Sequence, residues 1–270
     1  MKFAICNEVF QNWDIAEAIK FASGAGYHGI EIAPYTLGRT VTEISAAERV
    51  RVREAAQRAQ LEICGLHWLL ARTEGFHLSH KDLSDRKRTS LYLCELVNCG
   101  SDLGGRLLTL GSPQQRSTPP EVSATQAREW AVETLRDAVK LAEDRGMTWC
   151  IEPLGPQETN FINTAAEAIE FAREFYSPAV KIVLDVKAMS TEPILIPNII
   201  RNSWPHFAHF HANDPNLKGP GFGAMNFRPI ATALREVGYQ GFVSVEVFNF
   251  DDGAETIATR SLRYLRSVFL

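Results

Sequence analysis

Four residues that can bind a divalent cation recur at regular intervals in the second half of this 270-residue chain: Glu152, Asp185, His211 and Glu246. Successive members are 33, 26 and 35 residues apart, and each interval is about the length of one strand plus one helix. Three carboxylates and an imidazole suit Mn²⁺, Mg²⁺ or Co²⁺, with coordination positions left open for substrate oxygens. Zn²⁺ is an alternative, although the set has no sulfur ligand. We therefore predict a site for one divalent ion, with Mn²⁺ expected first.

Such a site supports proton transfer at a carbon atom next to a carbonyl group. A metal that polarises the carbonyl and holds an adjacent hydroxyl acidifies the carbon-bound proton and stabilises an enediolate. One carboxylate removes the proton, and a second carboxylate on the opposite face returns one. Return to the same carbon gives an epimer, whereas return to the neighbouring carbon interconverts an aldose and a ketose. The sequence leaves both outcomes open.

A repeated strand–helix pattern predicts how these residues are positioned. Amphipathic helical stretches such as residues 129–145 alternate with eight short apolar runs, which are Lys2–Cys6, Gly29–Ile32, Glu62–His67, Arg106–Leu110, Thr148–Glu152, Lys181–Asp185, His206–His211 and Gly241–Glu246. Eight such units are typical of a closed (β/α)₈ barrel, whereas five or six would indicate an open sheet. No linker-like stretch divides the chain, so we expect one TIM barrel domain over residues 1–270.

The alternation of side chains along each strand predicts which residues face the barrel axis. In 148–152, Trp149 and Ile151 would face the helices, which leaves Cys150 and Glu152 pointing inward. The same parity turns Asp185 and Glu246 toward the axis. Because barrel enzymes carry their active sites at the carboxyl ends of the strands, the four candidate ligands should meet at that rim. The segments 71–83, 111–121 and 214–227 are expected to be loops of the same face.

Composition narrows the class of protein further. A net charge of −4 gives no general attraction for nucleic acids or anionic membranes, so neither is an expected partner. The five cysteines include no C-x-x-C pair, which favours buried free thiols over a zinc ribbon or a disulfide framework. No basic-then-apolar leader and no apolar run of membrane-spanning length occur. We expect a cytoplasmic protein.

Several stretches resemble the xylose isomerase-like barrel superfamily: residues 150–154 (CIEPL), 183–185 (VLD), 209–214 (HFHAND) and 243–246 (VSVE). This superfamily includes ketose 3-epimerases of the tagatose/psicose type. The resemblance implies that Glu152, Asp185, His211 and Glu246 are the metal ligands, and that Glu152 and Glu246 also form the acid/base pair. It further implies a small sugar substrate and a dimeric or tetrameric assembly.

Other polar residues are candidates for substrate binding. Glu158 completes a Glu-x5-Glu pattern that the epimerases share, and Lys218 stands where they place a basic residue. Lys187 follows Asp185 closely, and His67 ends the third predicted strand. Each also has a purely structural reading, as a loop carboxylate, an exposed lysine or a core histidine. Asn7, Glu8 and Glu31 are expected to line the pocket, and His209 either orients a ligand from below or fills a barrel layer.

Two departures from the epimerase pattern leave other functions open. Ala188 replaces a histidine that contacts substrate in the epimerases, and Gly155-Pro-Gln157 replaces a usual Asn-Arg pair. The substrate is therefore expected to differ from a free ketohexose. The alternatives are an inosose-type dehydratase on the same site, an endonuclease IV-like nuclease and a non-catalytic sugar-binding barrel. The nuclease is disfavoured because a zinc cluster would need more histidines than this chain supplies.

Overall fold

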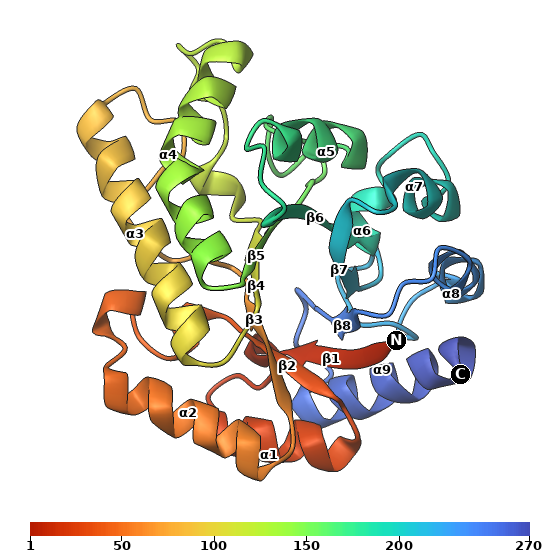
Figure 1. Ribbon diagram of the computed structural model, residues 1–270. Helices are drawn as coiled ribbons and strands as arrows, with labels where there is room; N and C mark the ends of the chain where they lie inside the picture. Colours follow the sequence, from red (N-terminus) through yellow and green to blue (C-terminus); the bar gives the residue numbers. More distant parts are fainter.

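Eight parallel strands form a closed barrel in sequence order in the computed structural model, which describes all 270 residues (Figure 1). The strands are β1 (Lys2–Cys6), β2 (Gly29–Ile32), β3 (Glu62–Leu66), β4 (Leu107–Leu110), β5 (Thr148–Ile151), β6 (Val180–Asp185), β7 (Phe207–Ala212) and β8 (Phe242–Val245). β8 pairs with β1, which closes the barrel. The predicted TIM barrel is confirmed.

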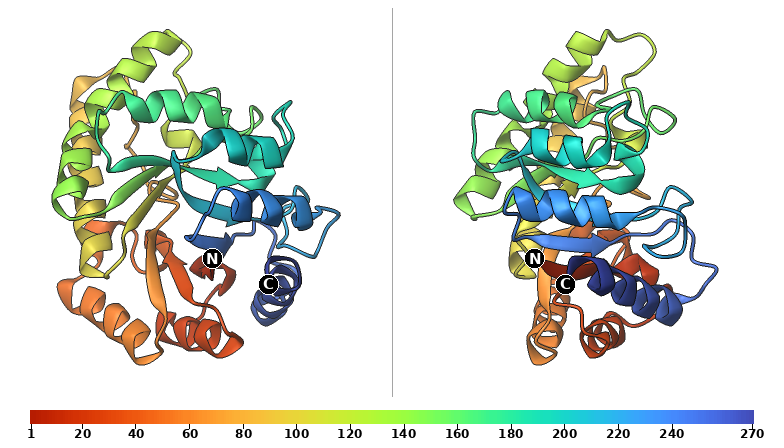
Figure 2. Two further views of the ribbon diagram at one scale, coloured as in Figure 1. Left: turned by 45° about the vertical axis from the view of Figure 1, so that its right-hand side comes forward. Right: turned by 90° about the vertical axis from the view of Figure 1, so that its right-hand side faces the viewer.

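Nine α-helices surround the strands, as Figures 1 and 2 show from three sides. They are α1 (Ile15–Ala25), α2 (Ala46–Arg58), α3 (Leu83–Asp102), α4 (Ala124–Asp144), α5 (Ala165–Arg173), α6 (Val186–Met189), α7 (Ile196–Ser203), α8 (Phe227–Glu236) and α9 (Ala254–Phe269). Local sequence sets several of their starts. Asp14 caps α1 by accepting a hydrogen bond from Ala16 N at 2.8 Å, and Thr164 forms a capping box with Glu167 at the start of α5.

The main core lies between the barrel and its helices and joins 71 buried hydrophobic residues in one cluster. Trp149 faces outward as predicted: its indole reaches helix α4 and donates a hydrogen bond to Ala138 O at 3.2 Å. The two ends of the chain meet in this layer. Phe3 of β1 packs edge-on against Phe269 of α9 with ring centroids 5.9 Å apart, which agrees with the neighbouring termini in Figure 2. One continuous core thus holds the whole ring of strands in register.

The observed strands differ slightly from the predicted runs at their carboxyl ends. β3, β5 and β8 stop one residue before His67, Glu152 and Glu246, respectively. Parallel pairing ends where the chain turns into the loops, but the inward direction of these side chains is kept. The three predicted loops of this rim correspond to the connections between β3 and α3, between β4 and α4, and between β7 and α8. The second of them contains a short 3₁₀ turn at Pro113–Gln115. None of the helices is both long and apolar enough to cross a membrane.

Candidate metal centre

The four predicted ligands converge at the carboxyl ends of β5 to β8. One ligand atom from each of them lies within 4.8 Å of the other three, and the set comprises Glu152, Asp185, His211 and Glu246. His211 Nδ1 lies 3.2 Å from Glu246 Oε2 and 3.5 Å from Glu152 Oε1. All four side chains are buried, the most exposed being Glu152 at 6%. The structure therefore brings together what the spacing predicted, while metal binding itself stays a prediction.

The donor set fits a divalent cation. His211 Nδ1 is buried without a hydrogen-bond partner and faces two carboxylates. Burial, with Glu246 and Glu152 nearby, raises the pKa of Asp185 to about 7, which means that the three carboxylates resist ionising together. Burial alone would raise the pKa of Glu246 as well, but His211 and His67 outweigh it and hold that pKa below its usual range. A divalent ion would reduce the repulsion between the carboxylates and would coordinate His211 Nδ1.

Asp185 and the start of α6 fix one side of the site. Asp185 Oδ1 accepts a hydrogen bond from Ala188 N at 2.7 Å and caps this one-turn helix. Asp185 Oδ2 accepts from Asn213 Nδ2, and Asn213 Oδ1 accepts from Lys187 N at 2.7 Å. Sequence reasoning missed Asn213. Its position two residues after His211 was the available signal, because that spacing returns a side chain to the same face of a strand.

Glu31 supports the site from below. Its Oε2 lies 3.3 Å from His211 Nε2 and its Oε1 lies 2.7 Å from His209 Nε2. Burial opposes ionisation of Glu31, yet His209 and His211 lower its pKa well below the usual range. Glu31 is fully buried and is not among the residues that line either of the two cavities described below, so its expected place in a sugar pocket stays a prediction. His209 is fully buried in the barrel and contacts Glu31, which also contacts His211, while its role in orienting a ligand stays a prediction.

The β4–α4 loop closes over Glu152. At Gly111 a Cβ atom would collide with Glu152 Oε2, so glycine leaves room for this carboxylate in its observed position. Arg116 of the same loop is buried and donates from Nη1 to Leu110 O at 3.2 Å, whereas its Nε and Nη2 have no partner. Burial lowers the pKa of Arg116 to about 10, although the charges of Glu152 and Glu158 oppose the shift. Neither residue was predicted, because both depend on how the loop folds back.

A cavity of about 80 Å³ opens above the cluster. Its lining includes three of the four predicted substrate contacts, together with two aromatic side chains and three of the candidate ligands: His67, Trp68, Glu152, Glu158, Asp185, Lys187, Glu246 and Phe248. Lys187 Nζ pairs with Glu158 Oε1 at 2.7 Å and lies 4.2 Å from the centre of the Phe248 ring. Lys218 does not line this cavity. Its ammonium pairs with Asp252 at 2.7 Å, so its substrate contact stays a prediction.

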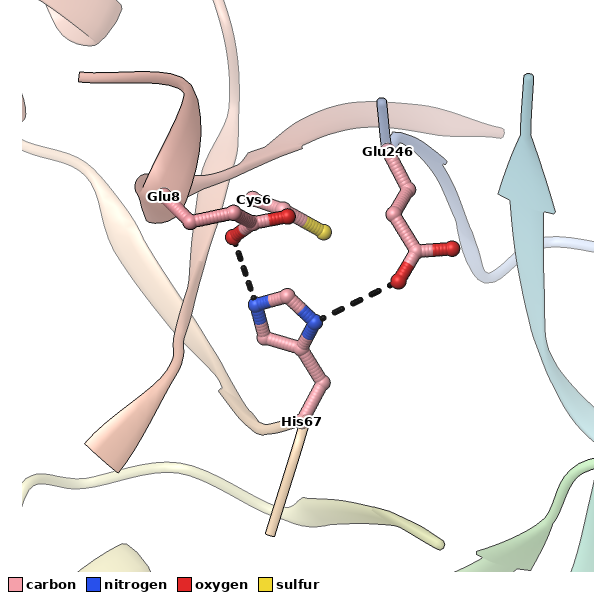
Figure 3. Close-up of side chains that lie close together, drawn as sticks. All are labelled: Cys6, Glu8, His67 and Glu246. Carbon is pink, nitrogen blue, oxygen red and sulfur yellow. Dashed lines mark ion pairs between the residues drawn. The ribbon is translucent and has the colours of Figure 1, made fainter. Parts of the chain in front are cut away.

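A larger cavity of about 470 Å³ lies beside the first, over the ends of β1 and β2. Asn7, Glu8, Tyr35 and Arg72 are among its lining residues. Side chains that line the two cavities contact each other: Glu8 Oε2 lies 2.9 Å from His67 Nε2 (Figure 3), and the Tyr35 and Trp68 rings pack edge-on with centroids 6.5 Å apart. Asn7 and Glu8 thus line the larger cavity, whose volume alone falls within the range of an ordinary ligand pocket, roughly 300–1,000 Å³.

The fold and this geometry agree with comparisons to known proteins. Residues 19–268 match the family described as xylose isomerase-like TIM barrel, and the chain belongs to this family. A D-psicose 3-epimerase of Agrobacterium fabrum is 35% identical over 136 residues, which is 50% of this chain and 46% of that protein. A fructoselysine 3-epimerase of Shigella flexneri is 26% identical over 250 residues, covering 88% of this chain and 86% of that protein.

Solved structures confirm the architecture along the full chain. A D-psicose 3-epimerase of Clostridium cellulolyticum H10 with D-tagatose superimposes with a TM-score of 0.88 at 23% identity, covering 100% of this chain and 99% of the other. The psicose epimerases matched by sequence align over less than half of their own length, 46% for the Agrobacterium protein. The two relatives described above are carbohydrate epimerases by name, and the comparison of structures establishes the shared barrel.

Proposed function

We propose that this protein is a divalent-metal-dependent epimerase that inverts a carbon next to the carbonyl of a ketose, as the named ketose 3-epimerase relatives do. The observation that carries the proposal is the placement of Glu152 and Glu246. Both belong to one buried cluster with ligand atoms within 4.8 Å of each other, yet they come from strands on opposite sides of β6 and β7. Two carboxylates that flank one substrate carbon can exchange protons on its two faces.

Glu152, Asp185, His211 and Glu246 would hold the ion, with Mn²⁺ expected ahead of Mg²⁺, Co²⁺ or Zn²⁺. When bound, the ion would draw electrons from the carbonyl and hydroxyl oxygens of the sugar and so acidify the carbon-bound proton. His211 and His67 keep Glu246 in the ionised form that a proton acceptor needs, although the same contacts lower its pKa and so weaken it as a base. Glu152, which begins the step protonated, would give its proton to the opposite face of the same carbon. Glu246 then loses its proton to solvent and Glu152 regains one, and the two carboxylates exchange roles in the reverse direction.

The surrounding residues support a sugar as the substrate. The buried Lys187 and the half-buried Glu158 form a polar pair at the cavity wall, and Phe248 and Trp68 offer apolar faces beside it. Ala188 is buried in the first turn of α6, so the imidazole found there in the epimerases has no counterpart. We infer a ketose with a different substituent pattern from free psicose or tagatose, reaching into the larger cavity next to Glu8.

Solvent deuterium exchange tests the proposal. Metal-free protein would be incubated in D₂O with Mn²⁺ and one of D-psicose, D-fructose, D-tagatose, L-ribulose or fructoselysine. Exchange at C3, detected by NMR, is expected for at least one sugar and should stop when the metal is chelated. Exchange at C1 would instead indicate aldose–ketose isomerisation, and a dehydrated product would indicate the inosose-type reaction. Absence of any exchange or turnover with all five sugars would contradict the proposed function.

A further inference from the structure

A second cluster of metal-ligand types lies beside the first and shares Glu246 with it. It consists of Cys6 at the end of β1, Glu8 in the following 3₁₀ turn, His67 after β3 and Glu246 after β8 (Figure 3). One ligand atom from each lies within 4.8 Å of the other three. All four residues are at most 5% exposed. This arrangement exists only because closure of the barrel places β1, β3 and β8 around a common space.

Several of these polar atoms have no hydrogen-bond partner. Both carboxylate oxygens of Glu8 and both ring nitrogens of His67 are buried and unpaired by hydrogen-bond geometry. His67 Nε2 lies 2.9 Å from Glu8 Oε2, and His67 Nδ1 lies 3.6 Å from Glu246 Oε1. Buried polar groups are normally satisfied, since an unsatisfied one costs on the order of 1–3 kcal/mol and a charged one more. The Glu8 oxygens thus present lone pairs that a cation would satisfy, and His67 would present one to a cation that displaces its ring proton.

The two oxygens of Glu246 face different clusters. Oε2 lies 3.2 Å from His211 Nδ1 in the first site. Oε1 faces His67 and accepts a hydrogen bond from Trp68 Nε1 at 3.0 Å. A carboxylate that points one oxygen toward each of two ligand sets is suited to bridge two cations, as in the two-metal sites of hydrolytic and transfer enzymes.

We propose that Cys6, Glu8, His67 and Glu246 bind a second divalent cation, for which Zn²⁺ is the best match, and that Glu246 bridges the two ions. One sulfur, one nitrogen and two oxygen ligands make a tetrahedral set that Zn²⁺ accepts. Bond lengths of about 2.0–2.3 Å put tetrahedral ligands roughly 3.4–3.8 Å apart. Side-chain rotation must therefore bring the most distant ligand atoms, now up to 4.8 Å apart, closer by about 1 Å, and it must separate Glu8 Oε2 from His67 Nε2, which now lie 2.9 Å apart. The thiol of Cys6 would bind as a thiolate, the form in which metals hold cysteine.

The local charge also favours a cation at this position. Five carboxylates are buried around the two clusters: Glu8, Glu31, Glu152, Asp185 and Glu246. His209 and His211 both contact Glu31, which leaves His67 as the one cationic group next to Glu8. A second ion would balance Glu8 and the Cys6 thiolate, and by holding Oε1 it would fix Oε2 of Glu246 toward the first site. The competing arrangement is a protonated His67 that pairs with Glu8 without any metal.

Cobalt substitution distinguishes these arrangements without measuring activity. Metal-free protein would be titrated with Co²⁺ while binding stoichiometry and the thiolate-to-cobalt charge-transfer absorption are followed. We expect two equivalents to bind and the charge-transfer band to appear with one of them. Cys6→Ser should abolish the band and reduce binding to one equivalent. Asp185→Asn should lose the other equivalent and keep the band. Cys94→Ser, in α3 and outside both clusters, is the matched control and should match the wild type.

A single equivalent without the band in the wild type would overturn the proposal and leave His67 as a protonated partner of Glu8. Retention of the band in Cys6→Ser would equally overturn it. If circular dichroism shows that Cys6→Ser does not fold, His67→Gln provides the second variant, with one equivalent expected to be lost. The second site shares Glu246 with the proposed epimerase centre but does not depend on sugar turnover. Failed deuterium exchange with two bound equivalents would therefore contradict the function and leave this site standing.

Discussion

Among single residues, Glu246 has the most roles in the proposed reaction, because it is both a proposed metal ligand and the proposed proton acceptor. Its carboxylate contacts His211 and His67 and accepts a hydrogen bond from Trp68. Glu246→Gln keeps the side-chain size but removes the proton acceptor, so turnover should fall by about 10²–10⁴. Glu170→Gln changes an exposed glutamate of α5 and should leave turnover unchanged. Rates with a responsive ketose under saturating Mn²⁺ test both variants, and near-normal turnover of Glu246→Gln would remove its catalytic role.

Glu31 should act on metal affinity through His211. Its carboxylate holds His211 Nε2 at 3.3 Å, which directs Nδ1 toward the candidate ligands. Glu31→Gln keeps the shape but loses the charge that orients this ring, and partners of this kind typically contribute 10–100-fold in metal affinity. Titration calorimetry with Mn²⁺ should show that loss, with folding confirmed by circular dichroism. Unchanged affinity would mean that strand β7 alone positions His211.

The direction of a side chain could be predicted from the sequence where the alternation of residues along a strand was enough to decide it. Glu152, Asp185 and Glu246 were placed toward the axis from alternation alone, because each ends a run whose outward residues are apolar. Glu31 and Asn213 were harder because their contacts reach across the barrel or between adjacent strand ends. Lys218 was assigned by resemblance, yet its pairing with Asp252 depends on how the loop before α8 meets the loop after β8.

At the scale of elements, the β4–α4 loop determines whether Glu152 has room to bind an ion. Gly111→Ala would place a methyl group against Glu152 Oε2, so the carboxylate must turn away or the loop must shift. We expect at least a tenfold loss in Mn²⁺ affinity, equivalent to about 1.4 kcal/mol, with smaller effects on thermal stability. Isothermal titration and thermal unfolding measure the two effects separately.

Gly24→Ala is the matched control for this substitution. No atom lies within 4 Å of the added carbon at Gly24, which is inside helix α1. Alanine should stabilise that helix by up to about 1 kcal/mol and leave Mn²⁺ affinity unchanged. An equal loss of affinity in both variants would attribute the effect of Gly111→Ala to general disturbance and not to Glu152.

Strand and helix alternation was readable from the sequence because each element buries one apolar face. The barrel order and the loops of the active rim followed from counting eight such units. The short α6 was not anticipated: it has only four residues, and its cap is Asp185, which was assigned to metal binding alone. The 3₁₀ turn Asn7–Val9 was also missed, although it directs Glu8 toward His67 and supplies part of the wall of the larger cavity.

At the scale of the whole molecule, the buried charges make stability depend on pH in the metal-free protein. Burial opposes the charged form of His67, but Glu8 and Glu246 raise its pKa to about 10, above about 6.5 for an unfolded histidine. The folded state therefore keeps a proton that the unfolded state loses, and the stabilisation present below pH 6.5 disappears as pH rises through 10. Asp185, with its pKa raised to about 7, stays protonated when folded and adds to the decline below pH 7.

We therefore expect the free energy of unfolding in the presence of a chelator to fall between pH 6 and 9, by up to about 1.4 kcal/mol per pH unit for each such group. Saturating Mn²⁺ should raise stability and flatten the decline, because ligand deprotonation favours metal binding as pH rises. Urea unfolding at pH 6, 7.5 and 9 measures both curves, and His67→Gln should reduce the chelated slope. A chelated protein whose stability rises over this range would show that the buried carboxylates and imidazoles do not share protons as their contacts indicate.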